Sequence, residues 1–402
     1  MPVLPTRGVP VELSRRGFIA AGIAGGLTLA GCSSSKPPAV GATAQMSAAI
    51  DAAEAARPHS GRTVTASLTP QVTQIDLGGP IVRTMAFGNT IPGPAIRAKV
   101  GDELVVNVSN RLGEPTSAHW HGIALRNDMD GAEPATPNID AGQDFTYKFS
   151  VPNAGTYWVH PHVGLQDDVG LYLPLIVEDP TEGDYDAEWI VVLDDWTDGV
   201  GKSPQQWYDE LANPSKPPMS MPASPAPSTT STTSTTSTTS TSETTSTSAT
   251  TSASGTTSAS ASPAAPPAPA ARVGTSDLLG GDAGDIAYPY YLINGRIPAA
   301  PTTFQAKPGQ RIRIRFINSG TDTAFRVALG GHSMTVTHTD GFPVVPTQVD
   351  ALLIGMAERY DVIVTAADGV FPLVALADGK NALARALLST GKGSAPDPQF
   401  QP

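Results

Sequence analysis

A thirteen-residue pattern occurs twice in this chain, and it restricts the possible folds more than any other feature. Residues 98–110 are AKVGDELVVNVSN, and residues 306–318 are AKPGQRIRIRFIN. The copies align without a gap, and each follows an Ile-Pro turn. In the second copy three arginines alternate with Ile312, Ile314 and Phe316, which is the period of a half-buried strand. Two copies of one β unit predict two similar β-sandwich domains.

Composition supports an all-β chain. The sequence has 39 Gly and 38 Pro residues, separated by Val-rich and Ile-rich runs, which is typical of strands joined by many loops. Residues 102–110, 144–151 and 171–179 have the character of strands. The formal net charge of −12 argues against a nucleic-acid partner, because phosphate binding requires basic patches and the only dense basic run is 311–315. We therefore expect two Greek-key β-sandwich domains.

The first 31 residues predict an export signal. Arg15 and Arg16 precede an uncharged run over residues 17–31, shorter than the roughly 20 residues of a membrane span. Paired arginines before such a run indicate the Tat route. The run ends in LAGC, which resembles the lipobox of bacterial lipoproteins, and this implies lipidation at Cys32. The alternative is a cleavable signal that happens to contain a cysteine. A lipid-modified Cys32 would anchor the exported protein to the outer face of the cytoplasmic membrane.

Changes in composition divide the rest of the chain. Residues 32–61 are small and polar and predict a tether, with a short helix in its Ala-rich stretch. The two domains are expected at 62–181 and 185–390. Within the second, residues 219–272 are almost wholly Ser, Thr, Ala and Pro. Such a segment cannot bury enough apolar surface to order itself, so it predicts a disordered insert or a glycosylated mucin-like stretch.

Four of the seven histidines form two His-x-His pairs, His119 with His121 and His160 with His162. Residues i and i+2 of a strand share a face, roughly 7 Å apart, so the intervening Trp120 would pack behind the first pair. If the two strands are neighbours, the four imidazoles form one patch. That spacing suits two or three adjacent metal ions rather than one, and imidazole ligands fit Zn, Cu, Ni or Fe. Pro161 indicates an edge strand or a strand end.

The other three histidines are not paired. His59 lies at the end of the tether, and His332 and His338 are six residues apart. For the last two we expect a packed or hydrogen-bonded role rather than metal binding.

Longer motifs around the pairs carry a family resemblance. TSAHWHGI, MDG and GTYWVHPHVGLQ resemble the first cupredoxin domain of multicopper oxidases, the laccase and cuprous-oxidase superfamily. INGRIP, GHSMTVTHTDGFPV and GMAERYDVIVTA resemble their second domain. With its export signal, the chain is similar throughout to the exported multicopper oxidases of actinobacteria.

The resemblance implies cupredoxin-like domains, a copper cofactor, and oxidation of cuprous ions, ferrous ions or phenols coupled to reduction of O2 to water. It implies that His119 binds the type 2 copper, and that His121, His160 and His162 bind the type 3 pair. The acid of MDG, Asp130, matches an outer-shell carboxylate that assists proton delivery during O2 reduction. Alone, Asp130 would be interpreted as a turn residue before Gly131.

The sequence also departs from the family. Two further copper motifs, His-Pro-x-His-Leu-His and His-Cys-His, belong to a third cupredoxin domain and are not found here. The only cysteine is Cys32, so no thiolate remains for a type 1 copper. We expect half of a trinuclear site, a tail at 391–402 where a third domain would begin, and no oxidase activity from these residues alone. This predicts a truncated family member; a membrane-anchored copper-sequestering protein and an inactive remnant are the alternatives.

Overall fold

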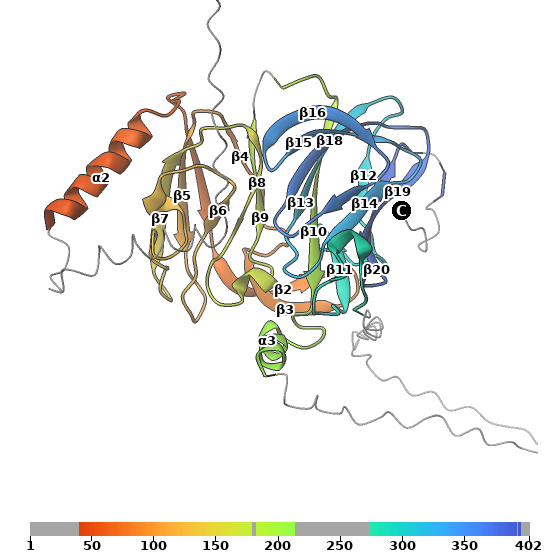
Figure 1. Cartoon of the computed structure of the whole chain (residues 1–402), viewed down its shortest axis with the longest axis horizontal. Helices are drawn as coiled ribbons and strands as arrows, with labels where there is room; N and C mark the ends of the chain where they lie inside the picture. Colours follow the sequence, from red (N-terminus) through yellow and green to blue (C-terminus); the bar gives the residue numbers. More distant parts are fainter. Residues whose placement is uncertain (1–39, 179–181, 214–272, 392, 395–402) are drawn as a thin grey trace, which may run out of the picture. The chain divides into compact units, whose positions relative to one another are not determined.

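The computed structural model describes residues 40–178, 182–213, 273–391 and 393–394 (Figure 1). The chain divides into two compact units, Met1–Ala56 and Arg57–Pro402. The described part of the first unit is one helix, α2 (Val40–Ala55), as expected for the Ala-rich stretch. The export signal, Cys32 and the Ser/Thr-rich insert lie outside the described residues. In the part that is described, no helix has the length and apolar character needed to cross a membrane.

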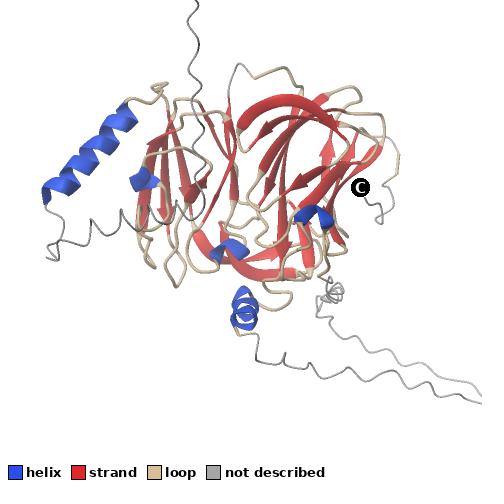
Figure 2. Cartoon of the chain, in the orientation of Figure 1, coloured by secondary structure: helices blue, strands red, loops and turns tan. Residues whose placement is uncertain are grey.

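Among the described residues of the second unit, the regular elements are almost all strands, as predicted (Figure 2). Its first sandwich has a three-stranded sheet in the order β1-β5-β7 and a four-stranded sheet in the order β4-β9-β8-β6. The strands are β1 (Thr63–Leu68), β4 (Ile96–Lys99), β5 (Glu103–Ser109), β6 (His119–His121), β7 (Asp144–Ser150), β8 (Gly155–His160) and β9 (Leu173–Glu178). Alternate residues of β5, with Trp120 of β6, lie in the core between the two sheets.

The second sandwich has a six-stranded sheet in the order β11-β10-β13-β18-β15-β16 and a five-stranded sheet in the order β12-β20-β19-β14-β17. The first contains β10 (Ala187–Trp196), β11 (Tyr290–Ile293), β13 (Arg311–Asn318), β15 (Met334–Thr339), β16 (Phe342–Val349) and β18 (Arg359–Thr365). The other contains β12 (Thr303–Gln305), β14 (Phe325–Leu329), β17 (Leu352–Ile354), β19 (Val370–Ala377) and β20 (Ala382–Ser389). A short helix, α3 (Pro204–Ala212), follows β10.

The two copies of the sequence repeat occupy equivalent strands. β5 pairs in parallel with β1 and antiparallel with β7. β13 likewise pairs in parallel with β10, the first strand of its own sandwich, and antiparallel with β18. The repeat therefore builds the same local pairing twice.

A third apolar cluster joins the two sandwiches. It is built around the two-stranded sheet of β2 (Pro70–Asp76) and β3 (Ile81–Phe87). Ile75 and Val82 from that sheet meet Trp158 of the first sandwich and Leu292 of the second. The domain boundaries at 62–181 and 185–390 stay a prediction, although each sandwich core draws its residues from inside one of these ranges.

The expectation that β13 is half-buried is wrong. Ile312, Ile314 and Phe316 do face the core. However, Arg313 and Arg315 are only 2% and 0% exposed. The outer face of β13 lies against β8 of the first sandwich rather than in water, and Arg315 Nη1 donates to the Thr156 hydroxyl at 2.9 Å. An alternating pattern shows that one face is polar, but not whether water or another polar surface covers it.

Candidate metal centre

The two histidine pairs meet on adjacent strands at the edge of the four-stranded sheet. β6 pairs antiparallel with β8, which places His119 opposite His160. Trp120 is fully buried behind them, as predicted from strand alternation. β8 ends at His160, so His162 lies just beyond the strand end that Pro161 predicted.

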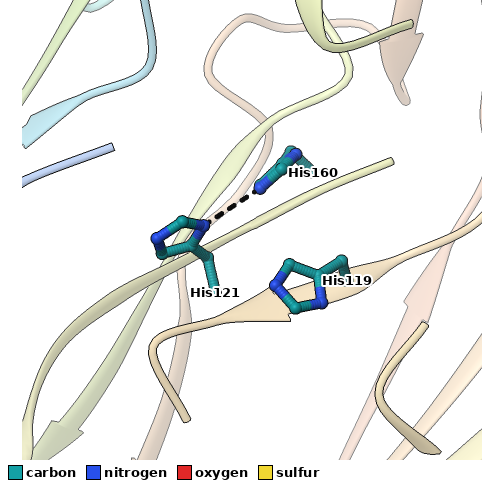
Figure 3. Close-up of side chains that lie close together, drawn as sticks. All are labelled: His119, His121 and His160. Atoms are coloured by element: carbon teal, nitrogen blue, oxygen red, sulfur yellow. Dashed lines mark hydrogen bonds between the residues drawn. The ribbon is translucent and has the colours of Figure 1, made fainter. Parts of the chain in front are cut away.

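The four imidazole rings form one cluster. The ring centroid of His119 lies 5.7 Å from that of His121, 5.4 Å from that of His160 and 4.5 Å from that of His162. Candidate ligand atoms of His119, His121 and His160 all lie within 4.8 Å of one another (Figure 3). The predicted single patch is thus present in the structure.

Hydrogen bonds to backbone carbonyls orient two of the rings. His119 Nδ1 lies 2.9 Å from the Asp130 carbonyl oxygen, and His160 Nδ1 lies 3.0 Å from that of Pro161. Because a carbonyl oxygen only accepts, each Nδ1 carries the hydrogen and each Nε2 keeps a free lone pair. This is the usual way in which a protein fixes the tautomer of a metal-binding histidine.

His121 and His160 turn ring nitrogens toward each other. His121 Nδ1 lies 3.2 Å from His160 Nε2, the dashed contact in Figure 3. Since Nε2 of His160 is the unprotonated atom, it accepts from His121 Nδ1 in this contact. The two nitrogens can face one shared cation when that hydrogen moves to His121 Nε2. All-imidazole donors of this kind fit copper.

Burial keeps these side chains neutral. It lowers the pKa of His121 to about 4, with the charge of Arg359 as the next cause. It lowers the pKa of His160 to about 3, where the other histidines of the cluster add to the effect. Burial also lowers the pKa of His162. Metal ions bind the neutral form of imidazole, so His121 and His160 can bind metal at neutral pH without releasing protons.

Asp130 lies beside the first ligand candidate. It caps the short 3-10 helix η1 (Asn127–Met129), and its Oδ2 lies 3.4 Å from His119 Nδ1. Gly131 makes this turn possible. Its φ is +82°, and a Cβ there would lie 1.9 Å from the Ala118 carbonyl oxygen, so only glycine fits. The structure therefore places the carboxylate of the MDG motif beside His119.

The other three histidines lie outside this cluster. His332 Nδ1 lies 2.9 Å from the Gly330 carbonyl oxygen, and its Nε2 accepts from the Ala367 amide at 3.0 Å. His338 Nε2 lies 3.3 Å from Glu182 Oε1. His59 Nδ1 lies 3.3 Å from the Ser150 hydroxyl oxygen.

Two neighbours of the cluster were not predicted from the sequence. Trp158 stacks on His160, with ring centroids 4.2 Å apart and planes 21° from parallel. The alternation of β8 could have found it, because residue 158 shares a face with residue 160. Arg359 comes from the second sandwich, so no pattern near the histidines indicates it.

Two sequence profiles, both described as multicopper oxidase, match residues 71–182 and 187–393. The multicopper oxidase MmcO of Mycobacterium tuberculosis is 66% identical over all of this chain and 72% of its own length. The chain belongs to the multicopper oxidase family. Copper resistance protein A of Escherichia coli is 31% identical over 83% of this chain. The chain spans about half the length of that relative, 52%.

Solved structures of multicopper oxidases have the same fold. The laccase of Botrytis aclada has a TM-score of 0.61 and 27% identity, over 87% of this chain and 57% of its own. The blue copper oxidase of Nitrosomonas europaea has a TM-score of 0.56 and 25% identity, over 82% of this chain and 86% of its own. They confirm the predicted cupredoxin-like fold, and family membership makes copper the expected cofactor.

Proposed function

We propose that His119, His121, His160 and His162 are copper ligands of an oxidoreductase that couples one-electron oxidation of a substrate to reduction of O2 to water. The convergence of the four imidazoles on one face is the observation that supports this most. Bound copper would supply the one-electron redox chemistry and the O2 reactivity. Cuprous ions, ferrous ions and phenols are the proposed substrates. Family membership favours this function over a copper-sequestering protein or an inactive remnant.

The geometry supports separate roles within the cluster. His121 and His160, with nitrogens 3.2 Å apart, would share one type 3 copper, and His162 would bind the other. His119, whose Nε2 is free, would bind the type 2 copper. Asp130 would hold a proton near His119 for delivery during O2 reduction, since its carboxylate oxygen lies 3.4 Å from that ring.

Copper binding is the direct test. The purified chain should bind copper, and His119→Ala combined with His160→Ala should remove most of it, because both pairs then lose a ligand. His59→Ala is the control, since His59 lies outside the cluster. Metal analysis and competition titration with a Cu(I) chelator measure both. Unchanged copper content in the double variant would contradict the assignment.

We further propose that these four ligands are half of a trinuclear site and that a third cupredoxin domain completes it. Cys32 is the only cysteine among these 402 residues, so the sandwiches offer no thiolate for a type 1 copper. The chain alone should show no intense blue absorption and only background O2 consumption. Fusing the third domain of a complete relative after Pro402 should produce both. A blue, active protein from these residues alone would disprove the half-site.

For location, we propose Tat export directed by Arg15 and Arg16, followed by lipid anchoring at Cys32. The protein should then fractionate with membranes and incorporate a labelled fatty acid. Cys32→Ala should abolish the labelling, while Arg15→Lys with Arg16→Lys should block export. Continued lipidation of the Cys32→Ala protein would exclude the lipobox.

A further inference from the structure

Arg359, the first residue of β18, extends from the second sandwich to the copper-binding strands of the first. It is 4% exposed. Its Nε donates to the Thr156 carbonyl of β8 at 3.2 Å. On its own side, Nη1 donates to the Ala357 carbonyl and pairs with Asp340 Oδ1, both at 3.0 Å. The guanidinium is therefore fixed by its own sandwich while it bonds to the neighbouring one.

The same guanidinium lies beside the end of β6. Gly122 directly follows His121, and a Cβ there would lie 2.3 Å from Arg359 Nη2 and 3.1 Å from Tyr157 Cδ1. Thus the space next to the backbone at Gly122 is filled by Arg359 on one side and by the Tyr157 ring on the other.

β6 depends on such contacts more than the other strands do. It has three residues and ends the sheet, so among the described strands it pairs with β8 alone. At its His119 end, the Asp130–Gly131 turn closes on Ala118 and His119. At its His121 end, Arg359 lies between Gly122 and the carbonyl of Thr156.

We propose that Arg359 is a positioning residue for the copper centre, which holds the His121 end of β6 against β8 so that His121 and His160 can share one ion. The inference rests on the proposed function. A side chain of the second sandwich would then set the relative position of two ligands in the first. Since the planar, forked guanidinium contacts Thr156, Ala357 and Asp340 at once, a lysine ammonium cannot reproduce the whole set.

A role of Arg359 through its charge and a role through positioning β6 predict different effects on copper binding. A buried cation beside a metal site repels the metal ion. If Arg359 acted only through its charge, Arg359→Met would bind copper more tightly than the wild type. Arg359→Lys, which keeps the charge, would bind copper as the wild type does. If Arg359 positions β6, both variants should bind Cu(I) about tenfold or more weakly, the usual effect of losing an outer-shell partner. The Cu(II) electron paramagnetic resonance spectrum should also change, because the ligand geometry changes.

Arg313→Lys is the matched control. Arg313 is as buried as Arg359, and its bonds go to Asp361 and Glu182 rather than to β6 or β8. It should leave both the Cu(I) affinity and the Cu(II) spectrum unchanged. Tighter or unchanged binding in both Arg359 variants, with an unchanged spectrum, would overturn the proposal.

A second readout needs no metal. In the metal-free full chain, hydrogen exchange in the peptide containing residues 119–122 should be at least about tenfold faster in Arg359→Lys than in the wild type. If wild type binds no copper, the proposed function fails, and this exchange measurement still decides whether Arg359 holds β6.

Gly122→Ala provides the test if the Arg359 variants do not fold. This variant keeps Arg359, but the added methyl group pushes the guanidinium away from the end of β6. It should weaken Cu(I) binding about tenfold. Gly164→Ala controls for backbone strain, since Gly164 also has a positive φ, +56°, but has open space around its Cβ position. Equal effects of the two glycine variants on copper would count against Arg359.

Discussion

Gly131 shows how a single backbone position brings a carboxylate beside a candidate ligand. Its positive φ and the 1.9 Å approach to the Ala118 carbonyl exclude any side chain. The turn then carries Asp130 to His119. Gly142, in the same sandwich, has a similar φ of +75° but no atom within 4 Å of its Cβ position.

We therefore predict that Gly131→Ala lowers the free energy of unfolding by at least about 2 kcal/mol more than Gly142→Ala does. Both variants carry the strain of an alanine at positive φ, and only the first adds a backbone clash. Urea unfolding of the metal-free proteins measures the difference. Equal losses would show that the loop relaxes around the methyl group.

Asp168 links the loop after His162 to the second sandwich. It ends the short 3-10 helix η2 (Gln166–Asp168), and its Oδ1 accepts from the Tyr288 hydroxyl at 3.2 Å and the Thr321 hydroxyl at 2.9 Å. Burial, followed by the nearby Asp195, raises the pKa of Asp168 to about 8. The folded protein therefore keeps this proton at pH values where the unfolded chain releases it.

The sign of the pH dependence follows. Between the ordinary aspartate pKa of 3.8 and about 8, the folded state binds more protons at Asp168, so its contribution to stability falls as the pH rises. Asp168→Asn removes this titration. Its melting temperature relative to wild type should increase from pH 5 to pH 8 and then level off. A difference that is constant with pH would mean that Asp168 is ionised in the fold.

The sequence predicted the residues of the metal centre better than their surroundings. Strand alternation put His119 and His121 on one face and Trp120 in the core, because that information lies within three residues. Arg359 could not be found in this way, since its relation to Gly122 exists only after two sandwiches, far apart in the sequence, have packed together.

At the scale of elements, a network of buried charges connects β13 to its neighbours β10 and β18, on the face that packs against the first sandwich. Asp361 Oδ2 accepts from Arg313 and Arg315, and Glu188 accepts from Arg315 Nε at 2.6 Å. Removing one member of a buried ion pair leaves the charge of its partner buried and uncompensated. Removing one member of an exposed pair costs little, because water replaces it.

Arg315→Met should therefore destabilise the protein by about 3 kcal/mol. Lys148→Met is the comparison. Lys148 pairs with Glu103 at 3.2 Å, with side chains 59% and 37% exposed, and its loss should cost no more than about 1 kcal/mol. Chemical denaturation of both variants measures the two losses in the free energy of unfolding. Similar losses would mean that water already reaches Arg315.

The repeat made β5 and β13 predictable as equivalent strands, because their alternation and their Ile-Pro turns are local. The exposure of the arginines was not predictable, because alternation does not identify what covers the polar face. The same limit applies to the edge position of β6. Its three residues show a shared face, but the sheet order that leaves them at an edge depends on β4, β8 and β9.

At the scale of the whole molecule, the Ser/Thr-rich insert interrupts the second domain between α3 and the 3-10 helix η3 (Asp277–Leu279). From its composition we predict that deleting residues 219–272 changes the free energy of unfolding by less than about 1 kcal/mol, because a segment almost wholly of Ser, Thr, Ala and Pro has little apolar surface to bury. Calorimetry of the deletion variant tests this. A large loss would show that the insert makes ordered contacts.

The register of β6 against β8 couples the packing of the core to the position of the candidate ligands. Moving β6 by one residue would turn Trp120 outward and place His119 and His121 in the apolar core. The same error thus removes one of the largest buried side chains and two of the ligand candidates at once. If the four histidines bind copper as proposed, a mispaired chain would lose two of the ligands, so retention of the metal would report correct strand pairing.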